Sequence, residues 1–389
     1  MTDSDRGASM AFAPDARHVV VFGLGLALAL GWLIEASRGA TEVDLPTAEA
    51  LAEPAWAERE VHFASGEVEI AGTLTLPSGA GPFPAAIHLS GAGVQDRDGS
   101  AANPDESRRT VEAFARARIA LLRTDDRGAG ESTGDSFQAT FDDLVDDAAA
   151  AVAFLAQDAA INPRHIGLIG ASQGAAIAGL TASRHDGIAF VVFYSGLGLP
   201  GKEVLYDQLA RMHRAGGLPE ATIEQALELT REGVGWLEAP IDDATRRDKL
   251  RPLARRLREL TRTNPFAARD SAASIEREVE HLTSPAFRSA LDYDPRPALR
   301  GLRCPVLVIH GELDLQVDPD LNLPPVEEAL AAAPTEDVTV VRFAGLNHYL
   351  QPAETGHLSE YGRHPRSPEV IERTTAWIAE RFVGREGAP

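Results

Sequence analysis

The chain has 389 residues and a formal net charge of −21 at pH 7. This acidity argues against nucleic acid and anionic membrane surfaces as ligands. The length allows one large α/β domain with an insertion, and the single cysteine, Cys304, precludes an internal disulfide. We expect no metal and no other cofactor. The run Asp96-Arg97-Asp98-Gly99 faintly resembles a calcium loop but lacks the carboxylate at the loop's last position.

The N-terminal part is expected to lie outside the fold. Residues 19–34 form an unbroken run of apolar residues and glycines, and a segment rich in Ala, Glu and Pro follows it. The run is longer than the core of a typical signal peptide and shorter than a full membrane span, so a cleaved signal and an uncleaved anchor fit equally well. We therefore assign residues 1–56 to a signal or anchor segment and a tether. The catalytic domain is expected outside the cytoplasm, either secreted or periplasmic, or anchored in the membrane by residues 19–34.

The next segments predict an α/β fold. Two β-like stretches between Arg59 and Leu76, separated by Ser65-Gly66, indicate an antiparallel hairpin. Strand and helix patterns then alternate from about residue 84 to 195 and again from 303 to 384, which favours a mostly parallel sheet with helices on both faces. Residues 57–197 and 295–389 are assigned to this core.

Two loops follow early strands. The strand Pro84 to Ser90 leads into the glycine-rich stretch Gly91 to Gly99, where small residues let the backbone approach a substrate. We expect Ala92 to supply one backbone N–H of an oxyanion hole, with Gly91 as the nearest alternative. The strand Ile119 to Thr124 leads into a second loop, residues 125–132. We interpret this loop as structural, with a substrate contact by Arg127 as the less favoured reading.

A short motif after the next strand carries the strongest chemical signal. Gly170-Ala171-Ser172-Gln173-Gly174 follows an apolar strand and opens an alanine-rich helix. In this G-x-S-x-G pattern the serine stands on a tight strand-to-helix turn, with its Oγ above the sheet. The Gln173 N–H at the helix N-terminus is expected to stabilise a developing oxyanion.

Residues 198–294 contain no convincing strand pattern and are assigned to an inserted helical lid. A helix is expected from Arg251 to Arg262, with Pro252 in its first turn and leucines at helical spacing. Trp236, the bulkiest aromatic residue of the insertion, is expected to pack in its core. Such an insertion at the carboxyl edge of the sheet would bound a substrate pocket.

The acid and the base come last. An apolar strand beginning near Cys304 ends in a turn with Asp314, and a strand from Val338 to Phe343 runs into His348. The order Ser172, Asp314, His348 is that of the α/β-hydrolases. An imidazole that takes the serine proton, oriented by a carboxylate, turns the hydroxyl into a nucleophile.

From about Val61 to the C-terminus the chain resembles the EstD-like serine hydrolases, a branch of the α/β-hydrolase superfamily related to serine-aminopeptidase-type enzymes and acyl-thioesterases. The matching stretches are residues 89–93, 95–99, 125–134, 196–208, 310–319 and 346–362. The resemblance implies hydrolysis of carboxylic esters with short or medium acyl groups through an acyl-serine intermediate. It places the nucleophile at Ser172, the acid at Asp314 and the base at His348. The chain departs from the family in having Ala171 and Gln173 beside the serine, where histidine and an acidic residue are common.

Three functions are candidates for this chain. A carboxylesterase acting on a small-molecule ester is favoured. A thioesterase or aminopeptidase-type hydrolase would use the same triad, and a catalytically silent binding protein would be indicated by loss of a triad residue, which the sequence does not show. The pattern leaves the acyl chain length, the natural substrate and the oligomeric state open.

Overall fold

The computed structural model describes residues 56–99, 104–264 and 272–384. The apolar run 19–34 lies outside these residues, so the signal or anchor remains a prediction. Among the described helices, none combines the length and the apolar character that crossing a membrane requires.

The strands form one sheet of eight, in the order β1-β2-β4-β3-β5-β6-β7-β8. Their bounds are β1 Trp56–Ser65, β2 Val68–Pro77, β3 Phe83–Leu89, β4 Ala120–Thr124, β5 Ile161–Ala171, β6 Val191–Tyr194, β7 Val306–Gly311 and β8 Val338–Phe343. The expected hairpin is β1 with β2, which turns at Gly66, and β2 also pairs antiparallel with β4. From β4 through β8 all neighbours are parallel, so the predicted mostly parallel sheet is confirmed.

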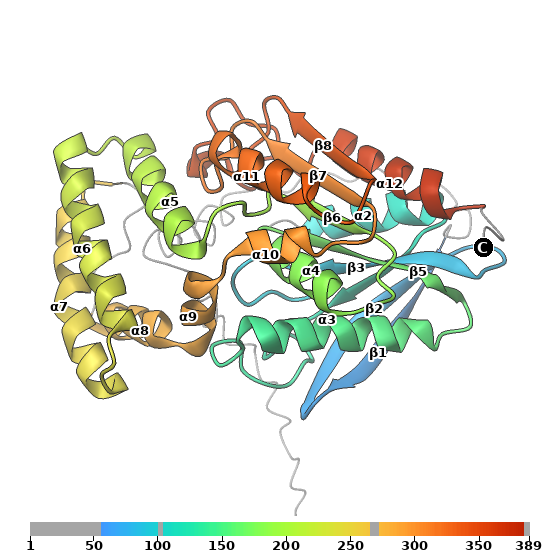
Figure 1. Cartoon of the computed structure of the whole chain (residues 1–389), viewed down its shortest axis with the longest axis horizontal. Helices are drawn as coiled ribbons and strands as arrows, with labels where there is room; N and C mark the ends of the chain where they lie inside the picture. Colours follow the sequence, from blue (N-terminus) through green and yellow to red (C-terminus); the bar gives the residue numbers. More distant parts are fainter. Residues whose placement is uncertain (1–55, 100–103, 265–271, 385–389) are drawn as a thin grey trace, which may run out of the picture.

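Helices cover both faces of the sheet (Figure 1). One face carries α3 (Phe141–Ala156), α4 (Gln173–Arg184), α10 (Pro295–Arg300) and α11 (Pro319–Ala331). The other carries α2 (Pro104–Arg116) and α12 (Pro368–Phe382). Because strand side chains alternate, Leu122 packs into the first core and Leu121 into the second. Cys304 is a buried member of the first core, as expected.

Between β6 and β7 the described residues form helices and no strand. These are α5 (Gly201–Ala215), α6 (Glu220–Glu238), α7 (Asp243–Thr261), α8 (Ala272–Thr283) and α9 (Pro285–Asp292), followed by α10. Figure 1 shows α5 to α9 gathered at one end of the molecule, with α6 and α7 farthest from the sheet. They have a hydrophobic core of their own, against which Trp236 packs.

The expected start of one helix near Arg251 is wrong. Helix α7 begins at Asp243, where the Asp242 carboxylate accepts a hydrogen bond from the Thr245 N–H, so Pro252 lies inside the helix. Proline removes one helical hydrogen bond and normally ends a helix. Here the chain continues because Leu250, Ala254 and Leu257 are buried among the other helices of the insertion, and this packing offsets the lost bond.

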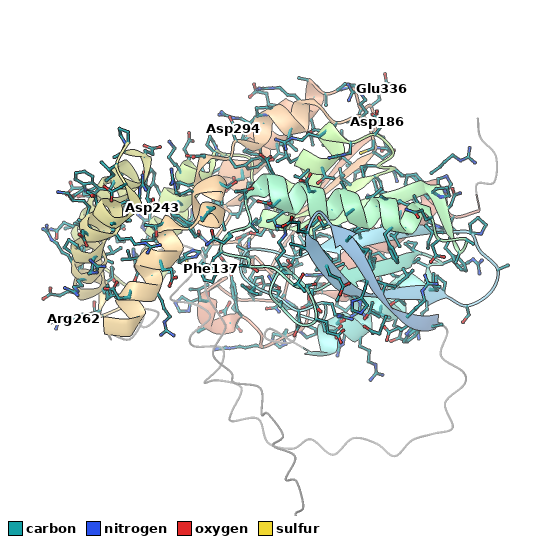
Figure 2. All side chains as sticks on the ribbon, turned by 90° about the horizontal axis from the view of Figure 1, so that it is seen from below. Phe137, Asp186, Asp243, Arg262, Asp294 and Glu336 are labelled. Atoms are coloured by element: carbon teal, nitrogen blue, oxygen red, sulfur yellow. The ribbon has the colours of Figure 1, made fainter. Side chains whose placement is uncertain are left out.

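The insertion meets the sheet domain near Phe137 (Figure 2). The Phe137 ring packs edge-on against the His281 ring of α8 at 5.8 Å, and its carbonyl accepts a hydrogen bond from the Ala286 N–H of α9. Two contacts from different helices therefore attach the insertion to the segment before α3.

Candidate active site

Ser172 stands on a strained turn between β5 and α4. Its φ is 53° and its ψ is −114°, a combination that residues other than glycine rarely adopt. The turn is anchored on both sides, because the Ser172 N–H donates to the Tyr194 carbonyl at 2.8 Å and the Ser172 carbonyl accepts from the Ala175 N–H at 3.0 Å. No cap hydrogen bond occupies the serine side chain at the start of α4.

The flanking glycines are required by close backbone contacts. A Cβ on Gly170 would clash with the backbone of Gly174, and a Cβ on Gly174 would clash with the carbonyl oxygens of Leu89 and Ser90. The elbow is thus pressed against the end of β3, which brings the segment after β3 close to the serine. A Cβ built on Gly91 would lie 3.7 Å from the Ser172 Cβ.

His348 and Asp314 form a buried pair. The His348 Nδ1 lies 2.8 Å from Asp314 Oδ2, and the side chains are 5% and 0% exposed. A carboxylate can only accept, so in the neutral imidazole Nδ1 carries the proton and Nε2 keeps its lone pair. The other carboxylate oxygen, Oδ1, accepts from the backbone N–H groups of Gln316 and Val317, both at 2.8 Å. These bonds fix the carboxylate, and the carboxylate fixes the imidazole.

Ser172 and His348 both line a cavity of about 550 Å³. Asp314 does not line it and stands behind the histidine. The insertion contributes apolar walls from α5 and α9, namely Val204, Leu205, Phe287, Ala290 and Leu291. Water is thus partly excluded from one side of the serine, which strengthens electrostatic contacts there.

The proposed oxyanion donors face the same cavity. Gln173 is the first residue of α4, so its N–H has no partner within the helix. Gly91 and Ala92 both line the cavity, and the choice of Ala92 over Gly91 remains a prediction. The side-chain Oε1 of Gln173 is buried without a hydrogen-bond partner.

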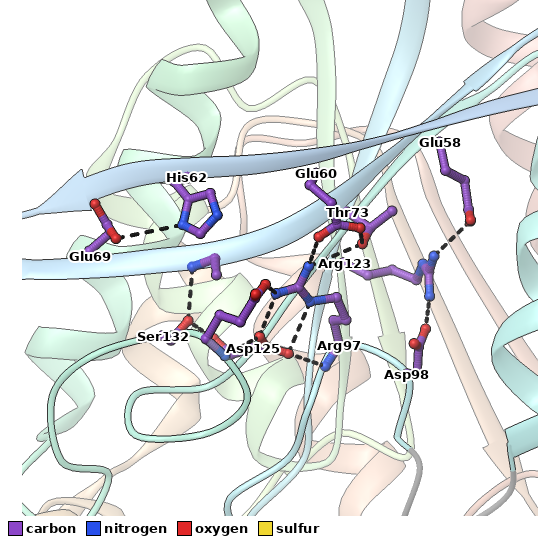
Figure 3. A network of polar contacts seen from close by, with 12 residues as sticks. Glu58, Glu60, His62, Glu69, Thr73, Arg97, Asp98, Arg123, Asp125 and Ser132 are labelled. Carbon is purple, nitrogen blue, oxygen red and sulfur yellow. Dashed lines mark hydrogen bonds and ion pairs between the residues drawn. The ribbon is translucent and has the colours of Figure 1, made fainter. Parts of the chain in front are cut away.

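An ion-pair network beside the cavity was not predicted (Figure 3). Arg97, in the loop after β3, donates from Nη2 to Asp125 Oδ2 at 2.6 Å and also pairs with Glu60 and Glu131. Burial alone would raise the pKa of Asp125, but the hydrogen bonds from Arg97 and from the Glu131 N–H lower it below its usual value. The opposite charges in the two loops were a usable signal, but their pairing depends on which strands are neighbours.

The cavity also has a charged wall that sequence reasoning missed. His88, Arg123 and Arg366 line it, and both arginines are paired, Arg123 with Asp98 and Arg366 with Glu106. Burial, with a further contribution from the two guanidinium groups, lowers the pKa of His88 to about 3. His88 is therefore neutral at pH 7.

Arg127 lies away from the catalytic cavity. It donates to both carboxylate oxygens of Asp147 on α3, at 2.7 and 2.8 Å, and lines a separate cavity of about 90 Å³. This position agrees with the structural interpretation of its loop. In the described part of the chain, no group of three or more His, Cys, Asp or Glu residues is arranged to hold a metal ion.

Comparison with known proteins gives a family and a fold. A family model described as serine aminopeptidase, S33, matches residues 105–355. An esterase from Pyrococcus furiosus is 17% identical, with 89% of this chain and 100% of that chain covered and a TM-score of 0.54. The α/β-hydrolase GrgF from Penicillium sp. sh18 is 16% identical, with 84% and 98% covered and a TM-score of 0.50. No protein of curated function matches the sequence. The predicted α/β-hydrolase fold is confirmed.

Proposed function

Because the chain belongs to the serine aminopeptidase S33 family of α/β-hydrolases, we propose that it is a serine carboxylesterase for short or medium acyl groups. The main support is that Ser172, on its strained turn, shares one cavity with His348, whose Nδ1 is bonded to Asp314. We also propose that it belongs to the EstD-like branch, because of its matching stretches at residues 89–93, 95–99 and 125–134.

In the proposed reaction, His348 Nε2 takes the Ser172 Oγ proton as Oγ attacks the ester carbonyl carbon. The carbonyl oxygen becomes an oxyanion, which the N–H groups of Gln173 and Ala92 stabilise. The intermediate collapses as the C–O bond to the alcohol breaks, and His348 returns the proton to the leaving oxygen. Water, deprotonated by His348, then attacks the acyl carbon. The bond to Ser172 Oγ breaks as His348 returns the proton to Oγ, which releases the carboxylic acid, and Asp314 stabilises the imidazolium in both steps.

The charges of the cavity favour an ester over an aminoacyl amide. Recognition of a substrate's free amine needs an available carboxylate. Three carboxylates of the described residues line the cavity. Asp98 and Glu106 are paired with Arg123 and Arg366, and Asp96 Oδ1 accepts from the Asp98 N–H at 3.2 Å. The apolar walls from α5 and α9 suit an acyl chain.

The test is a panel of chromogenic esters of increasing chain length, run beside a thioester and an aminoacyl amide. We expect the esters to be turned over fastest. Ser172→Ala, His348→Ala and Asp314→Asn should each lower kcat by roughly 10³-fold or more, and the losses should not add because the residues act as a unit. If the amide or the thioester is hydrolysed faster than every ester, the protein is an aminopeptidase-type hydrolase or a thioesterase and not a carboxylesterase. Full activity of Ser172→Ala would exclude the serine mechanism.

A further inference from the structure

The segment that is expected to supply an oxyanion donor has empty space on both of its sides. This oxyanion loop, residues 90–95, connects the end of β3 to the Arg97 network. Ser90, Gly91 and Gly93 line both the catalytic cavity and the separate cavity of about 90 Å³. Gly91, Ala92 and Gly93 have little or no side chain to pack. Packing alone therefore does not determine where the loop's N–H groups lie.

One side chain bonds both ends of this loop. Asp126, just past the end of β4, accepts from the Ser90 hydroxyl through Oδ1 at 2.6 Å and from the Gln95 N–H through Oδ2 at 2.8 Å. Its own N–H donates to the Gln95 carbonyl at 3.0 Å. Three hydrogen bonds from a single residue thus fix the first and last residues of the oxyanion loop.

Asp126 is itself attached to rigid structure. The preceding residue, Asp125, donates its N–H to the Ala71 carbonyl of β2 and accepts from the Glu131 N–H and from Arg97. Figure 3 shows this network spanning the β1–β2 hairpin and the two loops. Asp126 therefore follows a residue that is hydrogen-bonded directly to the sheet.

We propose that Asp126 is a positioning residue for the oxyanion hole, which holds the loop 90–95 so that its backbone N–H can reach the transition state. The inference rests on the proposed function. Asp126 does not line the catalytic cavity, so it acts through the loop and not on the substrate. A carboxyl group suits this place: when ionised it accepts from both the Ser90 hydroxyl and the Gln95 N–H, and when protonated it can donate to the Ser90 oxygen while still accepting from the Gln95 N–H.

Two substitutions test the geometry. Asp126→Ala removes both side-chain bonds, and we expect kcat for a short ester to fall by about 10- to 100-fold, approaching the loss of one oxyanion donor. KM should change far less. Asp126→Asn should recover most of kcat, because its amide oxygen can accept from the Gln95 N–H while its NH₂ donates to the Ser90 oxygen.

A second readout separates positioning from general damage. An alkylboronic acid forms a tetrahedral adduct with the serine, and its affinity should fall in Asp126→Ala in parallel with kcat. The matched control is Ser136→Ala. Ser136 lines the same small cavity and its hydroxyl donates to the carbonyl of Arg127, in the loop that also holds Asp126, without touching residues 90–95. The control substitution should leave kcat and boronate affinity unchanged.

The outcomes are distinguishable. If Asp126→Ala lowers kcat no more than Ser136→Ala at a comparable melting temperature, the positioning role is wrong while the esterase proposal stands. If Asp126→Ala does not fold, Ser90→Ala removes one of the two bonds and should lower kcat several-fold, and an unchanged kcat there overturns the inference. If Ser172→Ala remains active, the proposed function fails first.

Discussion

At the scale of the residue, Ser172 combines chemistry with backbone strain. A residue other than glycine with φ near 53° and ψ near −114° costs on the order of 1–3 kcal/mol. The surrounding contacts maintain this conformation, since Gly170 and Gly174 leave no room for the turn to relax toward β3 or α4. The strained backbone conformation places the nucleophile at the tip of the elbow.

The strain predicts a difference between two inactive variants. Ser172→Gly relieves the strained φ, whereas Ser172→Ala keeps it. We expect the glycine variant to be more stable than the alanine variant by about 1 kcal/mol, although glycine ordinarily destabilises ordered backbone. Urea unfolding of the two proteins measures this directly. An alanine variant that is the more stable of the two would show that the turn carries no strain.

The raised pKa of the Asp126 carboxyl group predicts that the stability of the protein depends on pH. Burial raises this pKa from 3.8 to about 7, with smaller contributions from the carboxylates of Asp125 and Asp147, against the hydrogen bonds from Ser90 and Gln95. The folded protein thus retains a proton that the unfolded chain releases above pH 4. The stability from this group is fully present below about pH 4 and is lost as pH rises through 7.

Asp126→Asn removes that titration. Its free energy of unfolding relative to the unmodified protein should rise between pH 5 and pH 8 by on the order of 2 kcal/mol, and comparing the two proteins cancels the other titrating groups. Urea unfolding at both pH values measures it. A difference that does not change with pH would contradict the raised pKa.

At the scale of the element, the insertion's helices are expected to set the acyl pocket. Leu205 of α5 lines the catalytic cavity, whereas Leu250 of α7 is buried among the helices without lining it. Leu205→Ala should lengthen the preferred acyl chain by enlarging the cavity. Each substitution should lower the free energy of unfolding by about 2–5 kcal/mol, but Leu250→Ala should leave the preferred acyl chain length unchanged.

A series of chromogenic esters from short to medium chains, assayed below the unfolding temperature of each variant, provides the measurement. Identical chain-length profiles for Leu205→Ala and the unmodified protein would mean that the insertion does not bound the acyl pocket. A shift in the Leu250→Ala profile would mean that the two leucines cannot be distinguished by their contact with the cavity.

At the scale of the whole molecule, every described strand and helix lies at or beyond Trp56. We expect a shortened protein that begins at Ala55 to fold and to keep the full kcat of the complete chain. The β1–β2 pairing, which starts with Trp56 opposite Pro77, remains intact in it. Inactivity of the shortened protein beside an active complete chain would place residues before Ala55 in the fold.

The sequence by itself determined which segments form the strands that precede the candidate triad and which residues make up that triad. Hydrophobic patterns are local, so the strands before Ser172, Asp314 and His348 could be read from the chain. The G-x-S-x-G motif likewise encodes its own turn. The start of α7 was missed because Pro252 looked like a first-turn residue, while the packing that carries the helix through it is not a local property.

Only the tertiary structure decided the pairing of the two loops. Residues 90–97 and 125–126 are separated by α2 in sequence, and they meet because β3 and β4 are parallel neighbours whose carboxyl ends lie at the same edge. The charges of Arg97, Asp125 and Asp126 were visible in the chain, but their partners were not. Hydrogen bonds between loops depend on strand order, and strand order results from the packing of the whole sheet rather than from any short segment.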